Sequence, residues 1–594
     1  MGARDSGSSR GFGTVRHEAD LCVVGGGMAG LCAAIAAARR GARAVLLQDR
    51  PVFGGNASSE IRMWLCGAHG EGNRETGLVE EIELDDIRRN PLKNWSVWDA
   101  LLWEKARFQE GLTPVLNCSC NAARMDGNRI VSVTGWQTTT QTWHEVRAAW
   151  FADCSGDSVL APLSGAEFRH GREAGAEFGE SIEPELADGR TMGMSCLIQA
   201  RKLAEPSPFR PPSWARRYES ESDLPFRDVD PLRGFNNYWW MELGGMGDSI
   251  GDTEAVRDEL LAVAFGVWDL VKNRSSVQDR DYWALDWVGF LPGKRESRRY
   301  VGDFVLSQKD VDAGGPFPDI VAYAGWTMDD HHPAGLDHPG KPNEFHPAPS
   351  PWGIPYRSLY SRNVANLCMA GRNISVTHAA LSSSRVMRTC ASLGQAVGTA
   401  AAIGARDGLD PREVGRERIV ELQQALMEDD CWLPGLTRRP TALTMEARPA
   451  ATAGDPEELR SGMDRPHDGR GNAWRAPLGA GAVYSFPSPR TVKGCRLVFD
   501  PDFSRDRADM RMLSSIPPDY RPVAVAATMV RAYRLEYRDR ADAGEWKPLA
   551  HVTDNHQRLN VVSFDPVRAG AVRLTLEGSW GNGEVSVFAW DLLD

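Results

Sequence analysis

The sequence lacks the features typical of membrane, secreted and nucleic-acid-binding proteins. It has no run of about 18 apolar residues and no apolar stretch near its start, so neither a membrane-spanning helix nor a secretion signal is indicated. Positive charge is not in excess, because 68 Lys and Arg residues stand against 80 Asp and Glu residues. The resulting net charge of -12 would repel nucleic acid and anionic lipid, so we expect a small-molecule partner.

Several signatures of catalysis and metal binding are also missing. The eleven cysteines include no CxxC pair, which argues against a disulfide framework and a zinc knuckle and favours the reduced cytoplasm. There is no P-loop, no H-E-x-x-H spacing and no G-x-S-x-G elbow, so acyl transfer is unsupported and no bound metal is expected. Cys118 and Cys120 are expected on one face of a strand rather than as a redox pair.

What the chain does have is length and an ordinary globular composition. Its 594 residues favour two to four domains at roughly 150 residues each. Apolar residues make up 42% and charged residues 25%, which argues against disorder or a fibrous repeat. The 20 tryptophans indicate aromatic surface that is either buried or facing a substrate, and composition does not separate the two.

The first ordered segment has the pattern of a strand, a glycine turn, a helix and a second strand. An apolar run at residues 21–24 leads into a G-x-G-x-x-G turn at 25–30. An Ala-rich helical stretch follows at 31–40, and a second apolar run follows at 44–47. A glycine turn in this context predicts a dinucleotide-binding βαβ unit.

The glycine turn and the end of the second strand supply the expected nucleotide contacts. Gly25 allows the tight turn, Gly27 lets backbone amides approach a pyrophosphate, and Gly30 lets the helix pack closely on its strand. The residue that holds the adenosine ribose should lie about 20 positions further on. That spacing leads to Gln48, whose amide we favour, and its neighbour Asp49 is the alternative if the strand end shifts by one residue.

Five motifs further along the chain indicate which dinucleotide is bound. They are GGNASSEIRM (54–63), DCSGDS (153–158), PGKRESRRYVGDFVL (292–306), AGWTMDDHHP (324–333) and NLCMAGRNISVTHAALSSSRVMRTCASLGQAVGTAAA (366–402). A βαβ unit followed by GG is similar to that of FAD-dependent oxidoreductases of the glutathione-reductase-like and fumarate-reductase-like superfamily. DCSGDS resembles the second FAD motif of that superfamily, and the last segment resembles its closing motif. Together the motifs resemble one bacterial family of FAD-dependent oxidoreductases.

The resemblance implies an α/β fold with FAD as the cofactor. It implies a discontinuous, Rossmann-like FAD-binding domain at 20–165 and 350–435 and an inserted α+β substrate or cap domain at 166–349. The opening residues themselves are expected to form a flexible N-terminal tail at 1–19. The residues expected to contact FAD are Gly25, Gly27, Gly30, Gln48, Asp49, Gly54, Gly55, Asn56, Ser58, Arg62, Ser155, Gly156, Asp157, Gly371, Arg372, Arg388, Gly394 and Gln395.

From about residue 440 the pattern changes to short alternating runs. These lie at 495–499, 533–537, 560–564, 572–576 and 585–590, with turn residues between them, and they predict an antiparallel β-sandwich over 440–594. The closing segment AVRLTLEGSWGNGEVSVFAWDLL resembles discoidin-like, galactose-binding-like domains. Such modules often bind glycans, yet many only pack against an enzyme domain, and both interpretations stay open.

Flavin chemistry requires a group that can move a proton near neutral pH, and histidine is the first choice. His331 in WTMDDHHP is the favoured residue, ahead of His69 in CGAHG and His378 before the closing helix. Asp329 stands two residues before His331, and on an extended segment the two side chains share a face. The carboxylate is therefore expected to orient or charge the ring, unless it caps a turn of its own backbone.

The basic run KRESRR offers a fixed cation. The family resemblance favours Arg298 near the flavin or the substrate, where it would stabilise a developing negative charge. The alternative is a solvated basic surface.

The leading hypothesis is an enzyme that oxidises an alcohol carbon of a polyhydroxylated substrate, such as a sugar, glycoside or cyclitol, by hydride transfer to flavin N5. His331 would remove the hydroxyl proton, with Asp329 orienting it and Arg298 binding charge. The predicted sandwich and the tryptophans motivate the choice of a carbohydrate. Two alternatives stay open: a flavin-dependent reductase or dehydrogenase of a C–C bond, of the fumarate-reductase-like type, and a glycan-binding protein with a structural FAD.

Overall fold

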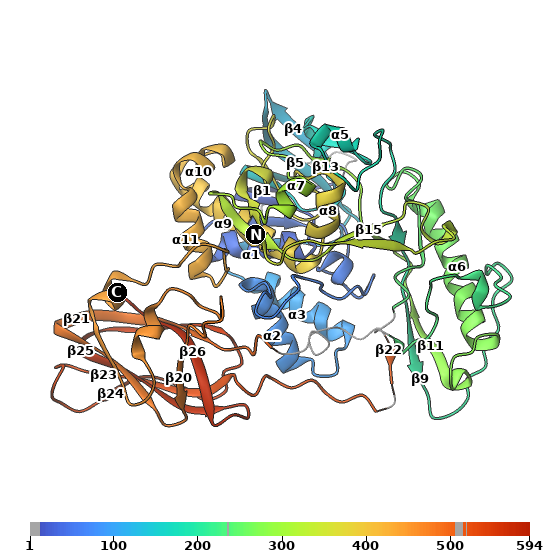
Figure 1. Ribbon diagram of the computed structural model, residues 1–594. Coiled ribbons are helices and arrows are strands. Elements are labelled where there is room, and N and C mark those ends of the chain that lie inside the picture. The colour runs from blue at the N-terminus through green and yellow to red at the C-terminus, as the bar shows by residue number, and fades with distance from the viewer. Residues whose placement is uncertain (1–11, 234–236, 505–514, 518) are drawn as a thin grey trace. The chain divides into compact units, whose positions relative to one another are not determined.

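A computed structural model describes residues 12–233, 237–504, 515–517 and 519–594 (Figure 1). The chain divides into two compact units, which are described separately below. The first unit comprises Met1–His69, Leu92–Leu422 and Arg511–Pro522. The second unit comprises Gly70–Pro91, Gln423–Met510 and Val523–Asp594.

A seven-stranded sheet forms the centre of the first unit. Its strands lie in the order β3-β2-β1-β6-β5-β4, and β18 pairs with β6. The strands are β1 (Thr14–Val24), β2 (Ala44–Leu47), β3 (Leu112–Val115), β4 (Cys118–Asp126), β5 (Arg129–Gln137), β6 (Thr142–Asp153) and β18 (Leu367–Met369). β1 pairs in parallel with β2 and β6, and helix α1 (Met28–Arg39) connects β1 to β2. The predicted βαβ unit is therefore confirmed.

Strand β1 begins at Thr14, so it differs from the flexible tail expected up to residue 19. Residues 14–19 pair in register with residues 143–148 of β6. The backbone supplies the hydrogen bonds of a ladder whatever the side chains are, which explains why this polar stretch gave no strand signal. Residues 1–11 of the expected tail lie outside the described residues.

Two helices pack closely beside this sheet. Helix α9 (Met387–Asp407) lies against α1, as Figure 1 shows. A Cβ atom on Gly394 would overlap the carbonyl oxygen of Ala29, so only glycine lets the two helices approach this closely. Gly394 therefore has a packing role that supports the start of α1, and the FAD contact expected of it stays a prediction.

The middle of the chain, together with residues 515–516, forms small sheets around further helices. One sheet has the order β10-β8-β12 and another has the order β11-β9-β22. Their strands are β8 (Met194–Ser195), β9 (Ile198–Lys202), β10 (Glu242–Leu243), β11 (Trp283–Val288), β12 (Gly293–Lys294) and β22 (Ser515–Ile516). Helix α6 (Thr253–Asn273) shares a core with them that contains Trp240, Trp268 and Trp283. This mixture fits an α+β region, and its boundaries at 166 and 349 stay a prediction.

Six more strands and several helices complete the first unit. β14 (Ile320–Ala324) pairs with β17 (Trp352–Pro355), and β15 (Met328–His331) pairs with β16 (Asn343–His346). The other elements are α3 (Trp95–Arg107), α4 (Leu160–Ser164), β7 (Phe168–Arg169), α5 (Gly175–Phe178), β13 (Arg299–Tyr300), α7 (Gln308–Asp312), α8 (His378–Ser384) and α10 (Pro411–Glu417). Helix α11 (Ile419–Glu428) crosses the boundary between the units.

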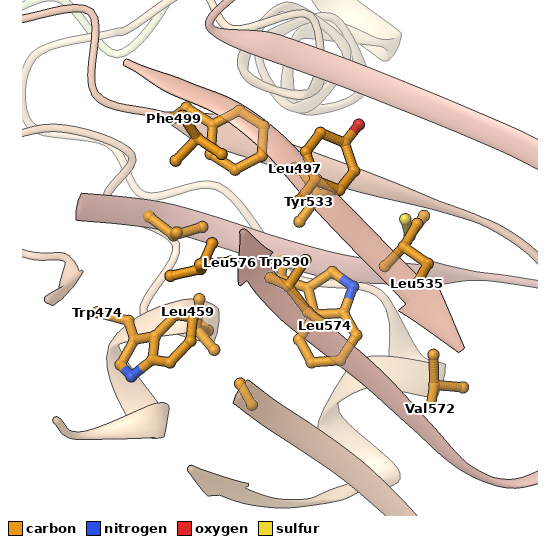
Figure 2. Close-up of a cluster of buried hydrophobic side chains, with 14 of the residues drawn as sticks. Leu459, Trp474, Leu497, Phe499, Tyr533, Leu535, Val572, Leu574, Leu576 and Trp590 are labelled. Atoms are coloured by element: carbon orange, nitrogen blue, oxygen red, sulfur yellow. The ribbon is translucent and has the colours of Figure 1, made fainter. Parts of the chain in front are cut away.

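The second unit is an antiparallel β structure. Its sheet has the order β20-β26-β21-β25-β23-β24, and β19 pairs with β21. The elements are α12 (Ala442–Glu446), β19 (Arg448–Ala451), β20 (Trp474–Pro477), β21 (Gly481–Phe499), β23 (Val530–Arg538), β24 (Lys547–Val552), β25 (Leu559–Ser579) and β26 (Glu584–Leu593). Figure 2 shows part of the apolar core that these strands enclose, including Leu497, Leu574 and Trp590. The arrangement fits the predicted β-sandwich.

Two alternating runs of the sequence belong to one strand. Residues 560–564 and 572–576 both lie in β25, although Pro566 and Gly570 between them resemble turn residues. The pairing with β21 continues through shifts in register, so the strand bends without ending.

The second unit also recruits a segment from early in the chain. Helix α2 (Leu78–Arg89) lies within the range expected for the FAD-binding domain, yet Leu84 and Ile87 are part of the core of the second unit. Asp85 accepts hydrogen bonds from His556 and Gln557, each at 2.7 Å. The expected FAD-domain range is thus interrupted at Gly70–Pro91.

Two negative findings concern the described residues only. None of the helices in this part of the chain has both the length and the apolar stretch needed to cross a bilayer. None of the cysteines there forms a disulfide, and Cys118 and Cys120 are buried on one face of β4, as predicted.

Candidate functional site

A cavity of about 430 Å³ opens where β1 and β2 end and α1 begins. This volume lies within the range of small-molecule sites, about 300 to 1,000 Å³. All of the residues that line the cavity belong to the first unit. They include eleven of the predicted FAD contacts: Gly25, Gly27, Gln48, Asp49, Gly54, Gly55, Asn56, Ser155, Gly156, Gly371 and Arg372.

The N-terminus of α1 is a candidate anion-binding site. Gly27 is the N-cap residue, and no side chain of the described residues caps this end of the helix. Gly27, Met28 and Ala29 all line the cavity, so the unpaired amides of the first turn lie beside it. A Cβ on Gly27 would meet only the Cα of Gly55, at 3.9 Å, so the space beside the turn is open. Open space at a helix N-terminus fits a diphosphate.

Gly25 has the tight turn that its position predicts. Its φ of 98° lies in the region that favours glycine, and a Cβ there would overlap the backbone of Ser155. The glycine turn before the N-terminus of α1 therefore tolerates no side chain at position 25.

Gln48 stabilises the glycine turn with its side-chain amide. Its Oε1 accepts a hydrogen bond from the Gly26 backbone N–H at 2.7 Å, and its Nε2 donates to the Val52 carbonyl at 3.0 Å. One N–H of the amide remains for a ribose hydroxyl. Asp49 also lines the cavity with a more exposed carboxylate, so both residues stay candidates for the ribose.

Seven predicted FAD contacts are not among the described residues that line the cavity: Gly30, Ser58, Arg62, Asp157, Arg388, Gly394 and Gln395. Ser58 donates to the Gly55 carbonyl at 2.7 Å and so supports a loop that does line it. The Arg62 guanidinium lies over the Trp287 ring at 4.4 Å, and burial lowers the pKa of Arg62 to about 10.

Asp157 positions two cations at the cavity wall. Its carboxylate accepts hydrogen bonds from Lys294 Nζ at 2.8 Å and Arg372 Nη2 at 2.7 Å, and both of these residues line the cavity. Burial alone would raise the pKa of Asp157, but Arg372 and Lys294 lower it to about 2. The carboxylate is therefore a permanent anion that fixes both cations.

His331 lies on the cavity wall between two carboxylates. Its Nδ1 is 2.6 Å from Glu242 Oε2, and its Nε2 is 3.2 Å from Asp329 Oδ2. The predicted proximity of Asp329 and His331 is observed, because β15 is extended and the two side chains share a face. Burial alone would lower the pKa of His331, but Glu242 and Asp329 outweigh it and raise the pKa. The ring is therefore held as an imidazolium.

Glu242 is a buried partner of this site that the sequence did not reveal. It comes from β10, far from His331 in the chain, and it has no motif of its own. Its Oε1 accepts from the Gly193 N–H at 2.7 Å, while its Oε2 contacts both His331 and Arg295 Nη1, the latter at 3.3 Å.

The arginines of the cavity differ from the predicted one. Arg298 does not line it among the described residues, and its guanidinium lies over the Phe168 ring at 5.4 Å. Arg295, from the same basic run, does line the cavity, as does Arg385 between α8 and α9. Arg385 Nη2 donates to the Asp329 carbonyl at 3.1 Å and lies 3.3 Å from its carboxylate.

The other predicted histidines are not among the described residues that line the cavity. His69 is not a lining residue, but its ring packs on Trp326, which is, with 4.3 Å between ring centroids. His378 is held as His331 is, with Nδ1 2.8 Å from Glu296 and Nε2 3.1 Å from Asp330. Asp330 follows Asp329 in β15. Asp329 therefore contacts His331 on one face of the strand, and Asp330 contacts His378 on the other face.

Some of the tryptophans noted in the sequence reach the cavity and others do not. Trp239, Trp326 and Phe345 line it, whereas Trp240 and Trp283 are buried in the core of the inserted region. Some of the tryptophans are therefore buried in a core, and others face the cavity where a substrate could bind.

The sequence model of one family, described as FAD dependent oxidoreductase, matches residues 20–426. The chain belongs to this family. Membership makes the chain an FAD-dependent oxidoreductase and makes FAD its cofactor. This agrees with the cavity lined by the glycine turn and the N-terminus of α1.

A curated relative shares part of this region. The FAD-dependent monooxygenase OpS4 of Beauveria bassiana (strain ARSEF 2860) is 28% identical over 188 residues, which are 32% of this chain and 35% of that protein. The chain thus matches about a third of the length of this relative.

Solved structures that are similar to the chain include two carbohydrate-binding modules. The family 32 module from Streptococcus pneumoniae EndoD is 18% identical, covers 25% of this chain and 95% of its own, and has a TM-score of 0.20. The family 32 module from C. perfringens NanJ is 14% identical, with 26% and 97% coverage and a TM-score of 0.19. TM-scores this low support no inference about this oxidoreductase.

The FAD-dependent oxidoreductase has, in its described residues, no group of three or more His, Cys, Asp or Glu side chains arranged to hold a metal ion. The residues that would hold FAD are those of the glycine turn, Gln48 or Asp49, the 54–56 loop, and the turns at 155–156 and 371–372.

Proposed function

We propose that this enzyme oxidises an alcohol carbon of a polyhydroxylated small molecule. Bound FAD supplies a hydride acceptor at its N5 position. The observation that carries the proposal is that Asp329 and His331 line the same cavity as the glycine turn. A base and a fixed cation thus border the space next to the residues that would hold the cofactor.

The roles proposed here for Asp329 and His331 differ from those in the sequence hypothesis. Both ring nitrogens of His331 face carboxylates and its pKa is raised, so the ring has no site for a hydroxyl proton. Asp329 is an ionised carboxylate on the cavity wall, and we assign it the role of base. A hydroxyl on a carbon that is losing a hydride becomes strongly acidic, so a weak base is sufficient. The His331 imidazolium stabilises the oxygen as its proton leaves.

The aromatic side chains of the cavity support a polyhydroxylated substrate. Trp239, Trp326 and Phe345 offer apolar ring surface beside charged groups. Such surfaces pack against the C–H faces of sugars and cyclitols, while the hydroxyl groups find donors and acceptors nearby.

The test is anaerobic mixing of the holoenzyme with a panel of sugars, glycosides and cyclitols, followed by flavin absorbance. A member of the panel should bleach the flavin. Asp329→Asn should slow this bleaching by about 10²- to 10⁴-fold, because it removes the base. Asp330→Asn is the matched control, since this neighbour serves His378 on the opposite face of β15. If no member bleaches the flavin, the proposal is refuted.

A second function is favoured by one specific observation. Arg295 and Arg385 line the cavity, and in a flavin-dependent reductase of a C–C double bond an arginine polarises the substrate carbonyl and stabilises the negative charge that forms as the hydride is added. In that case chemically reduced holoenzyme is reoxidised by unsaturated carbonyl compounds and not by ketones. The arginines to substitute are then Arg295 and Arg385, which line the cavity, rather than Arg298.

We also infer that the enzyme works in the cytoplasm. The absence of disulfides among the described cysteines supports a reducing compartment.

A further inference from the structure

Five charged side chains form one alternating chain at the cavity wall. Arg295 contacts Glu242 at 3.3 Å, Glu242 contacts His331 at 2.6 Å, His331 contacts Asp329 at 3.2 Å, and Asp329 contacts Arg385 at 3.3 Å. The order of charges is therefore cation, anion, cation, anion, cation. Because both ends are arginines, the chain carries one positive charge in excess.

This excess charge is poorly solvated. The side chains of Glu242 and His331 are 1% and 4% exposed, and those of Arg295 and Arg385 are 11% and 13% exposed. Removing a charge from water is costly unless a partner of opposite sign compensates it. A site with one surplus cation is therefore completed by a ligand that brings one negative charge.

Other charged groups near the chain have partners of their own. Asp330, on the opposite face of β15, is paired with His378. Lys294 and Arg372 are both held by Asp157. These contacts leave the surplus charge of the five-membered chain in place.

Arg385 is the member of the chain that is available to a ligand. Arg295 donates to Ser195 Oγ and to the Trp239 carbonyl, each at 2.9 Å, besides its contact with Glu242. Arg385 uses only Nη2, towards Asp329, and its Nη1 makes no hydrogen bond to another described residue. The N–H groups of Nη1 can donate to a carboxylate oxygen of a ligand in the cavity, and the charge of the guanidinium strengthens that hydrogen bond.

We propose that the substrate carries a carboxylate that binds Arg385, so that the enzyme acts on a polyhydroxylated acid such as a uronate or an aldonate. This inference rests on the proposed function, because it assumes that the substrate occupies this cavity. A phosphate group would offer Arg385 the same oxygens, but its second charge exceeds the single surplus of the chain. We therefore favour the carboxylate, and sugar phosphates form a separate arm of the test.

The test is calorimetric binding to the holoenzyme with matched ligand pairs. The pairs are glucose and glucuronate, galactose and galacturonate, and glycerol and glycerate, with glucose 6-phosphate as the phosphate arm. At least one acid should bind about tenfold to a hundredfold more tightly than its neutral partner, as hydrogen bonds to charged groups do. In Arg385→Met this preference should be lost, and in Arg385→Lys it should be partly retained.

Arg357→Met is the matched control, because Arg357 is also paired with a carboxylate, that of Asp319, but does not line the cavity among the described residues. The control should keep the acid preference. Asp329 keeps His331 and Asn343 as partners when Arg385 is replaced, so the variant should fold, and its melting temperature verifies this.

The outcomes separate the inference from the proposed function. Equal binding of every acid and its neutral partner, a preference that survives in Arg385→Met, or a preference for the phosphate alone would each overturn the carboxylate inference. Bleaching by neutral sugars would then still support the proposed function. Conversely, an Arg385-dependent acid preference with no bleaching by any hydroxylated compound would uphold carboxylate binding by Arg385 and overturn the proposed function.

Discussion

Replacing Glu242 with glutamine should lower the pKa of the His331 ring. Glu242 Oε2 lies 2.6 Å from Nδ1 and is one of the two carboxylates that keep the ring charged. Glutamine has nearly the same shape and keeps an oxygen for the Gly193 N–H, but it loses the negative charge. Its amide N–H can also donate to Nδ1, which is possible only when that nitrogen is unprotonated.

The size of the change follows from the distance. An opposite charge within about 4 to 6 Å shifts a pKa by about 1 to 3 units, so the variant should lower the His331 pKa by about that much. The folded protein raises this pKa above the usual value of about 6.5, so the protonated form prevails at low pH and is lost as pH rises through the raised value. If the imidazolium is required, kcat/KM falls on the alkaline side, and in Glu242→Gln this fall should occur at a lower pH.

Two measurements check the prediction. The first is the pH profile of kcat/KM with a substrate that bleaches the flavin. The second is NMR of histidine rings labelled at Cε1, in which His331→Gln identifies the resonance of His331. The second measurement requires no substrate and reports the ring directly.

Glu296→Gln is the matched control. Glu296 is equally buried, accepts from the Met192 N–H at 2.9 Å and holds His378 at 2.8 Å, but it does not line the cavity among the described residues. Both variants should lower the melting temperature, because each removes a buried charge with several partners. Only Glu242→Gln should shift the alkaline fall of kcat/KM to a lower pH. An unchanged His331 resonance in Glu242→Gln, or an equal shift of this fall in both variants, would refute the reasoning.

Three further predictions concern the site and the fold. His331→Gln should lower kcat/KM by about 10²-fold or more in steady-state assays, whereas His378→Gln should leave it within a few-fold, because only His331 lines the cavity. Gly394→Ala should destabilise the protein by about 1 to 3 kcal/mol in thermal unfolding and weaken FAD retention, since the new Cβ overlaps the Ala29 carbonyl at the start of α1. Leu574→Ala should cost about 2 to 5 kcal/mol in urea unfolding, because this side chain is fully buried in the core of the second unit.

The parts of the site that the sequence predicted depend on neighbours along the chain. The glycine turn follows a strand and opens a helix, so its role is visible within a short segment. Asp329 and His331 are two residues apart, and the alternation of a strand brings them together whatever the rest of the fold does.

The parts that the sequence missed depend on contacts between distant segments. Glu242 reaches His331 from another sheet, and Arg385 reaches Asp329 from the link between two helices. The basic run showed that arginines were present, but which of them faces the cavity depends on where β12 ends and β13 begins. Composition does not fix that point, and Arg295 rather than Arg298 lies on the wall.

The recruitment of α2 into the second unit has a consequence for biosynthesis. Leu84 and Ile87 leave the ribosome long before β25 and β26, which contribute residues to the same core. The core around these two apolar side chains is therefore incomplete until those strands are translated. A chain cut short after the nucleotide-binding segments would leave this helix exposed to chaperones and proteases.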